Sequence, residues 1–271
     1  MTERKAVIAD WRRERMNLYL VGDAHVGALA CNEKAIAELA ATIAADEDAA
    51  VIGLGDFIEA IGYHDRRFDP RELVEPIAPE HIENPFYCQA LRFCKLWEST
   101  AGKWLGVIRG NHESKALSNY HFDAVAVIAE RLGCKYIGGS DEGGWLLLRL
   151  FDGDKLRNRV KVFVQHGWGG GELRGGDALK LQRVLWRKDA DIVAFGHSHR
   201  PMAFPESVES IDRAGKPTRS DRWGVICYPL VGKHGYIARK AGNSPPPGYV
   251  VAHVERMHDG AARIGVEMRS L

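Results

Sequence analysis

Five short apolar runs in this chain each end in Asp, Asn or His, and this recurrence constrains fold and chemistry more than any other feature. The runs have the length and composition of buried strands. Open α/β proteins place ligands at the carboxyl ends of sheet strands, so the pattern predicts a site at one edge of a sheet. The closing segments are Asp23-x-His25, Gly55-Asp56, Gly110-Asn111-His112, His166-Gly167 and Gly196-His197-Ser198-His199.

The first three runs are expected to be strands, and segments whose apolar residues recur at helical spacing lie between and after them. This β-α-β-α-β order implies a parallel sheet with helices packed on it, and therefore an α/β fold. The expected strands are 17–21, 50–54 and 105–108, and the expected helices are 36–43, 93–97 and 122–129.

Strands outnumber helices in the rest of the chain, which predicts a second, antiparallel or mixed sheet. Residues 62–85 contain Pro70, Pro76 and Pro79 and show no period, so we interpret them as an insertion over one edge of the site. The whole chain, residues 1–271, is expected to be one domain. The expected strands are 145–151, 160–165, 192–195, 223–230, 248–255 and 262–268, with one helix after Asp177.

The composition excludes several classes of protein. The chain has 37 Lys and Arg against 36 Asp and Glu, so it lacks the overall basic field that many nucleic-acid binders use, although a local basic patch is compatible with it. No apolar stretch approaches the roughly 20 residues that a membrane span needs. Its five cysteines, an odd number without CxxC spacing, predict reduced and mostly buried thiols in a cytoplasmic protein.

The residues that close the strands are also of the types that bind transition metals. Imidazole nitrogens and carboxylate oxygens are ligands of Mn²⁺, Fe and Zn²⁺. In Asp23-x-His25 and His197-x-His199 the paired side chains would point the same way if each strand continued through them. Each segment alone carries little weight, because Gly-Asp is usually a turn and Gly-Asn-His could be a left-handed loop. All five in this order favour a metal centre.

Read as motifs over residues 23–199, these segments resemble the calcineurin-like metallophosphoesterase superfamily. The resemblance rests on Asp-x-His, Gly-Asp-x-x-Glu ending at Glu59, Gly-Asn-His-Glu ending at Glu113, His-Gly and Gly-His-x-His. It implies a four-layer α/β/β/α sandwich with mixed sheets and a site for two divalent metal ions at the sheet edge. Manganese is the expected metal, and iron, zinc, magnesium and nickel are alternatives.

The resemblance also implies a role for each strand-end residue. The implied ligands are Asp23, His25 and His199 for one metal ion, Asn111, His166 and His197 for the other, and Asp56 as the bridge. His112 would be the catalytic histidine outside the metal shell. The implied reaction is phosphodiester hydrolysis, in which a metal-bound hydroxide attacks phosphorus in line and His112 protonates the leaving oxygen. The substrate is expected to be a small or nucleotide-like phosphoester.

Other functions stay open at this point. Residues 109–113 are similar to the block found in Ser/Thr protein phosphatases, a class of phosphomonoesterase, but those enzymes carry an Arg-Gly pair after the second motif that this chain lacks. Residues 55–62 and 196–201 are similar to UDP-diacylglucosamine pyrophosphohydrolases of lipid A synthesis, which usually have Arg in place of His112. DNA and RNA nucleases and a metal-free interaction scaffold are the remaining alternatives.

Basic residues follow the His166-Gly167 segment and raise the question of a nucleic-acid surface. With Trp168 and Trp186 they could track a polynucleotide backbone, but we expect a solvated helix face with both tryptophans partly in the core. Gly167–Gly171 is either an anion-binding or a flexible loop. His64 and His234 are expected to be surface residues. The basic residues are Arg174, Lys180, Arg183, Arg187 and Lys188.

Overall fold

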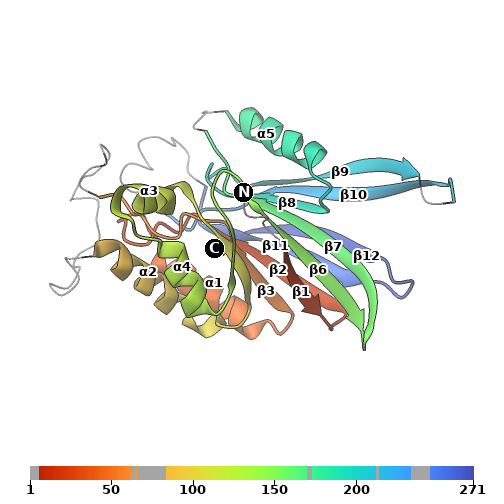
Figure 1. The fold of residues 1–271 in the computed structure, drawn as a ribbon, viewed down its shortest axis with the longest axis horizontal. Helices are drawn as coiled ribbons and strands as arrows, with labels where there is room; N and C mark the ends of the chain where they lie inside the picture. Colours follow the sequence, from red (N-terminus) through yellow and green to blue (C-terminus); the bar gives the residue numbers. More distant parts are fainter. Residues whose placement is uncertain (1–5, 63–64, 66–83, 170–172, 212–213, 233–244) are drawn as a thin grey trace.

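The computed structural model describes residues 6–62, 65, 84–169, 173–211, 214–232 and 245–271. Within these residues the strands form two six-stranded sheets of mixed direction (Figure 1). Sheet A has the order β1 (Val7–Trp11), β6 (Gly144–Asp152), β7 (Lys155–Gln165), β8 (Ile192–Phe195), β10 (Pro217–Ile226) and β9 (Met202–Ile211). Sheet B has the order β12 (Ala262–Ser270), β11 (Gly248–Arg256), β2 (Arg15–Val21), β3 (Ala49–Gly53), β4 (Trp104–Ile108) and β5 (Lys135–Gly138).

Strands β2, β3 and β4 of sheet B run parallel, as the sequence predicted, and β5 adds a fourth parallel strand; β7 and β8 of sheet A are also parallel. Helices fill the crossovers of sheet B, since parallel neighbours need a long connection. Parallel strands bring their carboxyl ends to one edge, and this edge carries the site. The helices are α1 (Glu33–Ala45), α2 (Pro85–Leu96), η3 (Glu98–Thr100), α3 (Asn111–Tyr120), α4 (Ala124–Leu132) and α5 (Arg174–Arg187).

Local signals in the sequence define where the helices of sheet B begin and end. The side chain of Asn32 accepts from the N–H of Ala35 at 3.1 Å and so caps the first turn of α1. Asn84 caps α2 in the same way, and Pro85 at its first position has no N–H to leave unpaired. Each cap contributes about 1 kcal/mol.

Three apolar layers hold the sheets and helices together. Between the sheets, β7 directs Val160, Val162 and Val164 inward while the residues between them face away from that core, which is the two-residue period of a strand with one core face. Helices α1, α2 and α4 cover the outer face of sheet B, and α5 covers part of sheet A through Leu181 and Leu185 (Figure 1). The predicted four-layer α/β/β/α sandwich is confirmed.

Several elements differ from the sequence prediction. The strands β1, β5 and β9 were not expected, because β1 and β9 are edge strands of sheet A without fully buried residues, and β5 is short. The helix expected over 122–129 is wrong at its start, since α3 precedes it and Phe122 lies in the turn between α3 and α4. Residues 62–85, the expected insertion, fall almost entirely outside the described residues.

Two further expectations concern the membrane and the cysteines. Among the described helices none combines the length and the apolarity needed to cross a bilayer. All five cysteines are free thiols, as predicted. Only Cys94 and Cys227 are buried, so the expectation that most would be buried was wrong for Cys31, Cys88 and Cys134. These three lie on helices or loops at partly exposed positions.

Candidate metal centre

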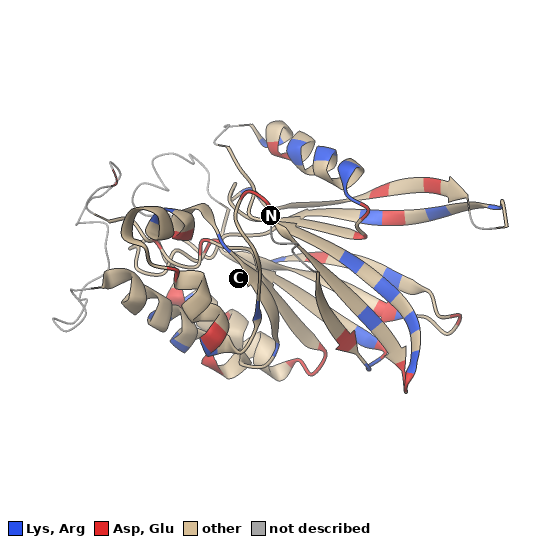
Figure 2. Ribbon diagram, viewed as in Figure 1, with Lys and Arg blue, Asp and Glu red and all other residues tan. Residues whose placement is uncertain are grey.

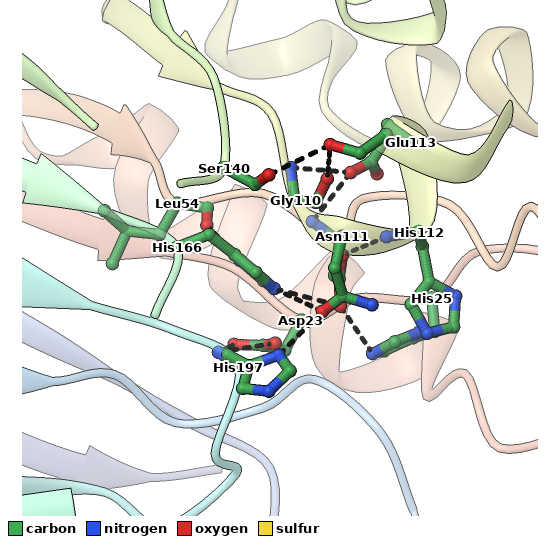
Figure 3. A network of polar contacts seen from close by, with 12 residues as sticks. Asp23, His25, Leu54, Gly110, Asn111, His112, Glu113, Ser140, His166 and His197 are labelled. Carbon is green, nitrogen blue, oxygen red and sulfur yellow. Dashed lines mark hydrogen bonds and ion pairs between the residues drawn. The ribbon is translucent and has the colours of Figure 1, made fainter. Parts of the chain in front are cut away.

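The predicted site residues lie in loops at the carboxyl ends of β2, β3, β4, β7 and β8, and the structure brings all of them together. Asn111 and His112 also begin α3. Figure 3 shows Asp23, His25, Asn111, His166 and His197 gathered with their polar atoms close to one another. Asp23, His25, Asp56, His112 and His166 are buried, and Asn111, His197 and His199 are partly exposed.

The first cluster consists of Asp23, His25 and His199. His199 Nε2 lies 3.3 Å from Asp23 Oδ1 and 3.3 Å from His25 Nε2. One ligand atom from each residue lies within 4.8 Å of the others, which is close enough for all three to contact one cation. The Asp23 carboxylate also accepts from the backbone N–H of His197, at 2.9 and 3.0 Å, so the loops after β2 and β8 are joined at this point.

The second cluster consists of Asn111, His166 and His197. Asn111 Oδ1 lies 3.1 Å from His166 Nε2 and 2.6 Å from His197 Nδ1. Asp56 lies between the two clusters, with Oδ2 at 3.1 Å from His166 Nε2 and 3.9 Å from His25 Nε2. Its other oxygen, Oδ1, accepts from the backbone N–H of residue 112 at 2.9 Å, which fixes the direction of Oδ2. A carboxylate in this position is able to contact cations in both clusters.

Hydrogen bonds to groups outside the clusters decide which nitrogen of each imidazole faces inward. When one ring nitrogen of a neutral imidazole donates its N–H, the other presents a lone pair, which is the form that binds a metal. The donor pairs are His25 Nδ1 to Glu59 Oε2 (2.9 Å), His166 Nδ1 to Leu54 O (2.7 Å) and His197 Nε2 to Gly169 O (2.8 Å).

The second cluster therefore contains acceptors that face acceptors. The lone pairs of His166 Nε2 and His197 Nδ1 both point at the amide oxygen of Asn111. A cation between them would satisfy all three atoms at once. Turning the Asn111 amide over would let its nitrogen donate to His197 Nδ1 at 2.6 Å, so this side chain can serve a cation through Oδ1 or the imidazoles through Nδ2. The donor set fits a divalent metal ion.

Protons compete with a cation for these lone pairs. Burial alone lowers the pKa of His25, but the Glu59 carboxylate and other nearby carboxylates outweigh it and raise that pKa to about 9. Burial likewise lowers the pKa of His166, and Asp56 reverses the effect and raises it to about 10. Burial lowers the pKa of His197 and keeps its imidazole neutral. The negative field that favours protons on His25 and His166 also favours a cation.

The backbone of the site is strained. The two strands end where the sequence predicted, β2 at Val21 and β8 at Phe195, so Asp-x-His and His-x-His are not alternate residues of a continuing strand. Both pairs lie in loops with left-handed residues, a conformation that costs roughly 1–3 kcal/mol each in non-glycine residues. The ligands with positive φ are Asp23 (51°), His25 (46°), Asp56 (50°), His197 (69°) and His199 (53°).

Glu113 stabilises the strained loop after β3 by hydrogen bonds to its backbone. Its side chain is fully buried and accepts from four backbone N–H groups. Those donors are Asp56 (3.1 Å), Phe57 (2.6 Å), Ile58 (3.1 Å) and Gly110 (2.9 Å). Burial and the Asp56 carboxylate raise the pKa of Glu113 to about 7. A Cβ at Gly110 would overlap Asp56, so only glycine allows these two loops to approach so closely.

His112 lies beside the first cluster. Its Nδ1 is hydrogen-bonded to the carbonyl oxygen of Glu59 and lies 3.7 Å from the carboxylate of the same residue. Its ring is perpendicular to that of His25, with centroids 4.5 Å apart. One ligand atom from each of His25, Asp56 and His112 also lies within 4.8 Å of the others. His112 is therefore close enough to act on a group held by either cluster.

A family model described as calcineurin-like phosphoesterase matches residues 16–201, which is more than half of the chain and includes every candidate ligand. The chain belongs to the calcineurin-like phosphoesterase family. Metal-dependent phosphoester hydrolysis is the chemistry of this family, and the clustered Asp and His side chains suit divalent metal binding. No curated protein matches the chain.

Solved structures that are similar to this chain have low sequence identity to it. Calcineurin-like phosphoesterase YfkN from Bacillus subtilis is 13% identical, with a TM-score of 0.43, and the match covers 94% of this chain and 90% of that one. Vps29 from Chaetomium thermophilum is 12% identical with a TM-score of 0.41, covering 95% and 97%. A predicted phosphoesterase from Streptococcus pneumoniae is 14% identical with a TM-score of 0.38, covering 93% and 98%.

The sequence did not identify the residues that position the ligands. Glu59 and Glu113 appeared only as members of motifs, and Gly169 only as part of a glycine-rich loop. The tryptophans were expected partly in the core, which is wrong, because Trp168 is 45% and Trp186 64% exposed. His64 and His234, which were expected to be surface residues, lie outside the described residues.

Proposed function

We propose that the chain is a phosphodiesterase that works with two divalent metal ions, one in each cluster, with Asp56 shared between them. The observation that supports this most strongly is the position of Asp56 Oδ2 between His25 Nε2 and His166 Nε2, at 3.9 and 3.1 Å. We expect Mn²⁺ to be the activating ion. Bound there, two divalent ions would supply Lewis acidity at phosphorus and activate the attacking water.

The side chains of the chain itself would orient the substrate and control protons. Asp56 and Asn111 would fix the relative position of the clusters, because both are tied to the start of α3. In its imidazolium form, His112 would donate the proton on Nε2 to the leaving oxygen of the ester and keep the proton on Nδ1. Its Nδ1 contact with the Glu59 carbonyl directs Nε2 away from that loop and makes it the nitrogen available to substrate.

The surface charges support a small substrate rather than a polynucleotide. Lys180 of the basic segment is turned inward to the carbonyl of Trp168 and to Asp177, at 3.0 and 3.2 Å, so the basic side chains do not form a continuous track. Figure 2 shows acidic and basic residues mixed along β9 and β10, next to α5. The indole N–H of Trp186 donates to Glu206, which brings a negative charge to the same face.

Hydrolysis of two synthetic esters tests the proposal. The protein is stripped with chelator, reloaded with Mn²⁺, and assayed with bis-p-nitrophenyl phosphate and p-nitrophenyl phosphate, with Asp56→Asn as control. We expect the diester to be hydrolysed faster, and the rate to vanish in the control. A faster monoester rate would favour a phosphomonoesterase instead. A protein that takes up no metal and hydrolyses neither ester would refute the proposal and favour a scaffold.

A further inference from the structure

The acceptor that receives the His197 N–H differs in kind from the acceptors of His25 and His166. His25 donates to a carboxylate on the neighbouring loop, and His166 donates to the carbonyl of Leu54, which is buried at the end of β3. His197 donates to the carbonyl of Gly169, in an exposed loop. The orientation of the His197 ring therefore depends on the position of that loop.

Lys180 of α5 supports this loop directly. Its ammonium group donates to the carbonyl of Trp168 at 3.0 Å, one residue before the carbonyl that receives the His197 proton. Gly169 has a φ of +90°, and a Cβ at this position would lie 2.8 Å from Lys180 Nζ. The absence of a side chain at Gly169 thus lets Lys180 Nζ lie directly against the backbone of the loop.

Asp177 in turn holds Lys180 and connects it to the other ligand loop. This carboxylate is only 4% exposed although it belongs to the first turn of α5. Its Oδ1 lies 3.2 Å from Lys180 Nζ, and its Oδ2 lies 2.9 Å from Nε of Arg200, the residue after His199. We call Asp177, Lys180 and Arg200 the α5 clamp. It joins one helix to the loops after both β7 and β8.

We propose that Lys180 is a positioning residue which, through the α5 clamp, keeps the His197 lone pair aimed into the second cluster and so sets the affinity of that cluster for its cation. The inference rests on the two-cation assignment of the proposed function. If Lys180 is replaced, the Trp168 carbonyl can bond to water instead, and the buried Asp177 loses one of its two cationic partners but keeps the ion pair with Arg200. The Gly169 carbonyl is then free to move, and His197 loses the bond that fixes its tautomer.

Calorimetric titration of the chelator-stripped protein with Mn²⁺ tests this inference. Lys180→Met should bind one ion as tightly as the parent and the other about 10–100-fold more weakly, the usual effect of losing a hydrogen-bond partner behind a metal ligand. Lys180→Arg keeps a donor for the Trp168 carbonyl and should recover part of that affinity. The matched control is Arg183→Met, which removes one positive charge from an exposed position of the same helix.

The outcomes separate this inference from the proposed function. Weaker binding at one site only in Lys180→Met, partly restored in Lys180→Arg and absent in Arg183→Met, supports the inference. If Lys180→Met binds both ions like the parent, or is weakened no more than Arg183→Met, the inference is wrong while the proposed function stands. If the parent itself binds fewer than two ions, the two-cation assignment fails and this inference fails with it.

Discussion

The two halves of the candidate site are built differently. The half formed by sheet B contains the loops after β2, β3 and β4, and Glu113 ties two of those loops with four hydrogen bonds from a fully buried position. The half formed by sheet A contains the loops after β7 and β8, with a single helix, α5, against them. There the support comes from ion pairs of Lys180 and Arg200 with Asp177. The sheet B half is thus stabilised by hydrogen bonds of a buried carboxylate, and the sheet A half by ion pairs of a buried carboxylate with two partly exposed basic side chains.

Because of this difference, mutations in the two halves should affect stability and metal affinity to different extents. Breaking the buried network of the sheet B half should affect both, because its N–H groups cannot reach water. Breaking the clamp of the sheet A half with Lys180→Met should lower metal affinity more than stability, because the Trp168 carbonyl that it frees belongs to an exposed residue and the buried Asp177 keeps its ion pair with Arg200. The four predictions below test this contrast and are ordered from the largest expected effect to the smallest.

Asp56→Asn should have the largest effect, because Asp56 lies between the two clusters, near His25 of one and His166 of the other. An amide keeps the size of the carboxylate but removes its charge, and with Oδ1 still accepting from the N–H of residue 112 it places an NH₂ group where Oδ2 lies. We expect diesterase activity to disappear and the metal content, measured by elemental analysis after gel filtration, to fall. Activity close to that of the parent in Asp56→Asn would contradict the shared role.

His112→Ala removes a residue of the sheet B half that we place outside the metal ligands. Turnover should fall by about 10²–10⁴-fold, the range for loss of a general acid, while the metal content stays that of the parent. Rates and elemental analysis on the same preparation check this. Loss of metal in step with activity would mean that His112 is a ligand, as its distance to His25 and Asp56 would also allow.

Glu113→Gln tests the buried network of the sheet B half. A glutamine keeps one acceptor oxygen and turns N–H donors toward backbone donors, so we expect unfolding to become easier by about 1–3 kcal/mol. Metal affinity should also drop, by roughly 10–100-fold. Thermal or urea unfolding beside calorimetry measures both. Lys180→Met is measured for comparison. If it lowers the free energy of unfolding as much as Glu113→Gln does, the two halves do not differ in the way described.

Metal binding should release protons. The pKa values of His25, about 9, and His166, about 10, are raised, so both imidazoles are protonated at pH 7 unless a cation displaces the protons. Apparent affinity should therefore rise with pH up to about 9–10 and level off above, with about two protons released at pH 7. Calorimetric titrations in buffers of different ionisation enthalpy give the number of protons released. An affinity independent of pH would contradict the assignment of these two ligands.

The residues that gather at the candidate site could be picked out from the sequence because each closes an apolar run that is visible locally. Their supports could not, since Glu113 lies 57 residues from Asp56 along the chain and Asp177 meets Arg200 only after α5 packs on sheet A. The left-handed backbone of residues such as Asp23 and His197 was also missed, because propensity assigns that conformation to Gly and Asn first. The edge strand β1 was missed because it pairs with β6, far away in sequence.

Electron paramagnetic resonance of the Mn²⁺-loaded protein tests the central claim most directly, because two Mn²⁺ ions that share a carboxylate are magnetically coupled and isolated ions are not. The parent at two equivalents of Mn²⁺ should give the broad spectrum of a coupled pair, and Asp56→Asn should not. A parent spectrum with only the six lines of isolated Mn²⁺, at full metal content, would contradict a shared Asp56 and with it the two-cation site.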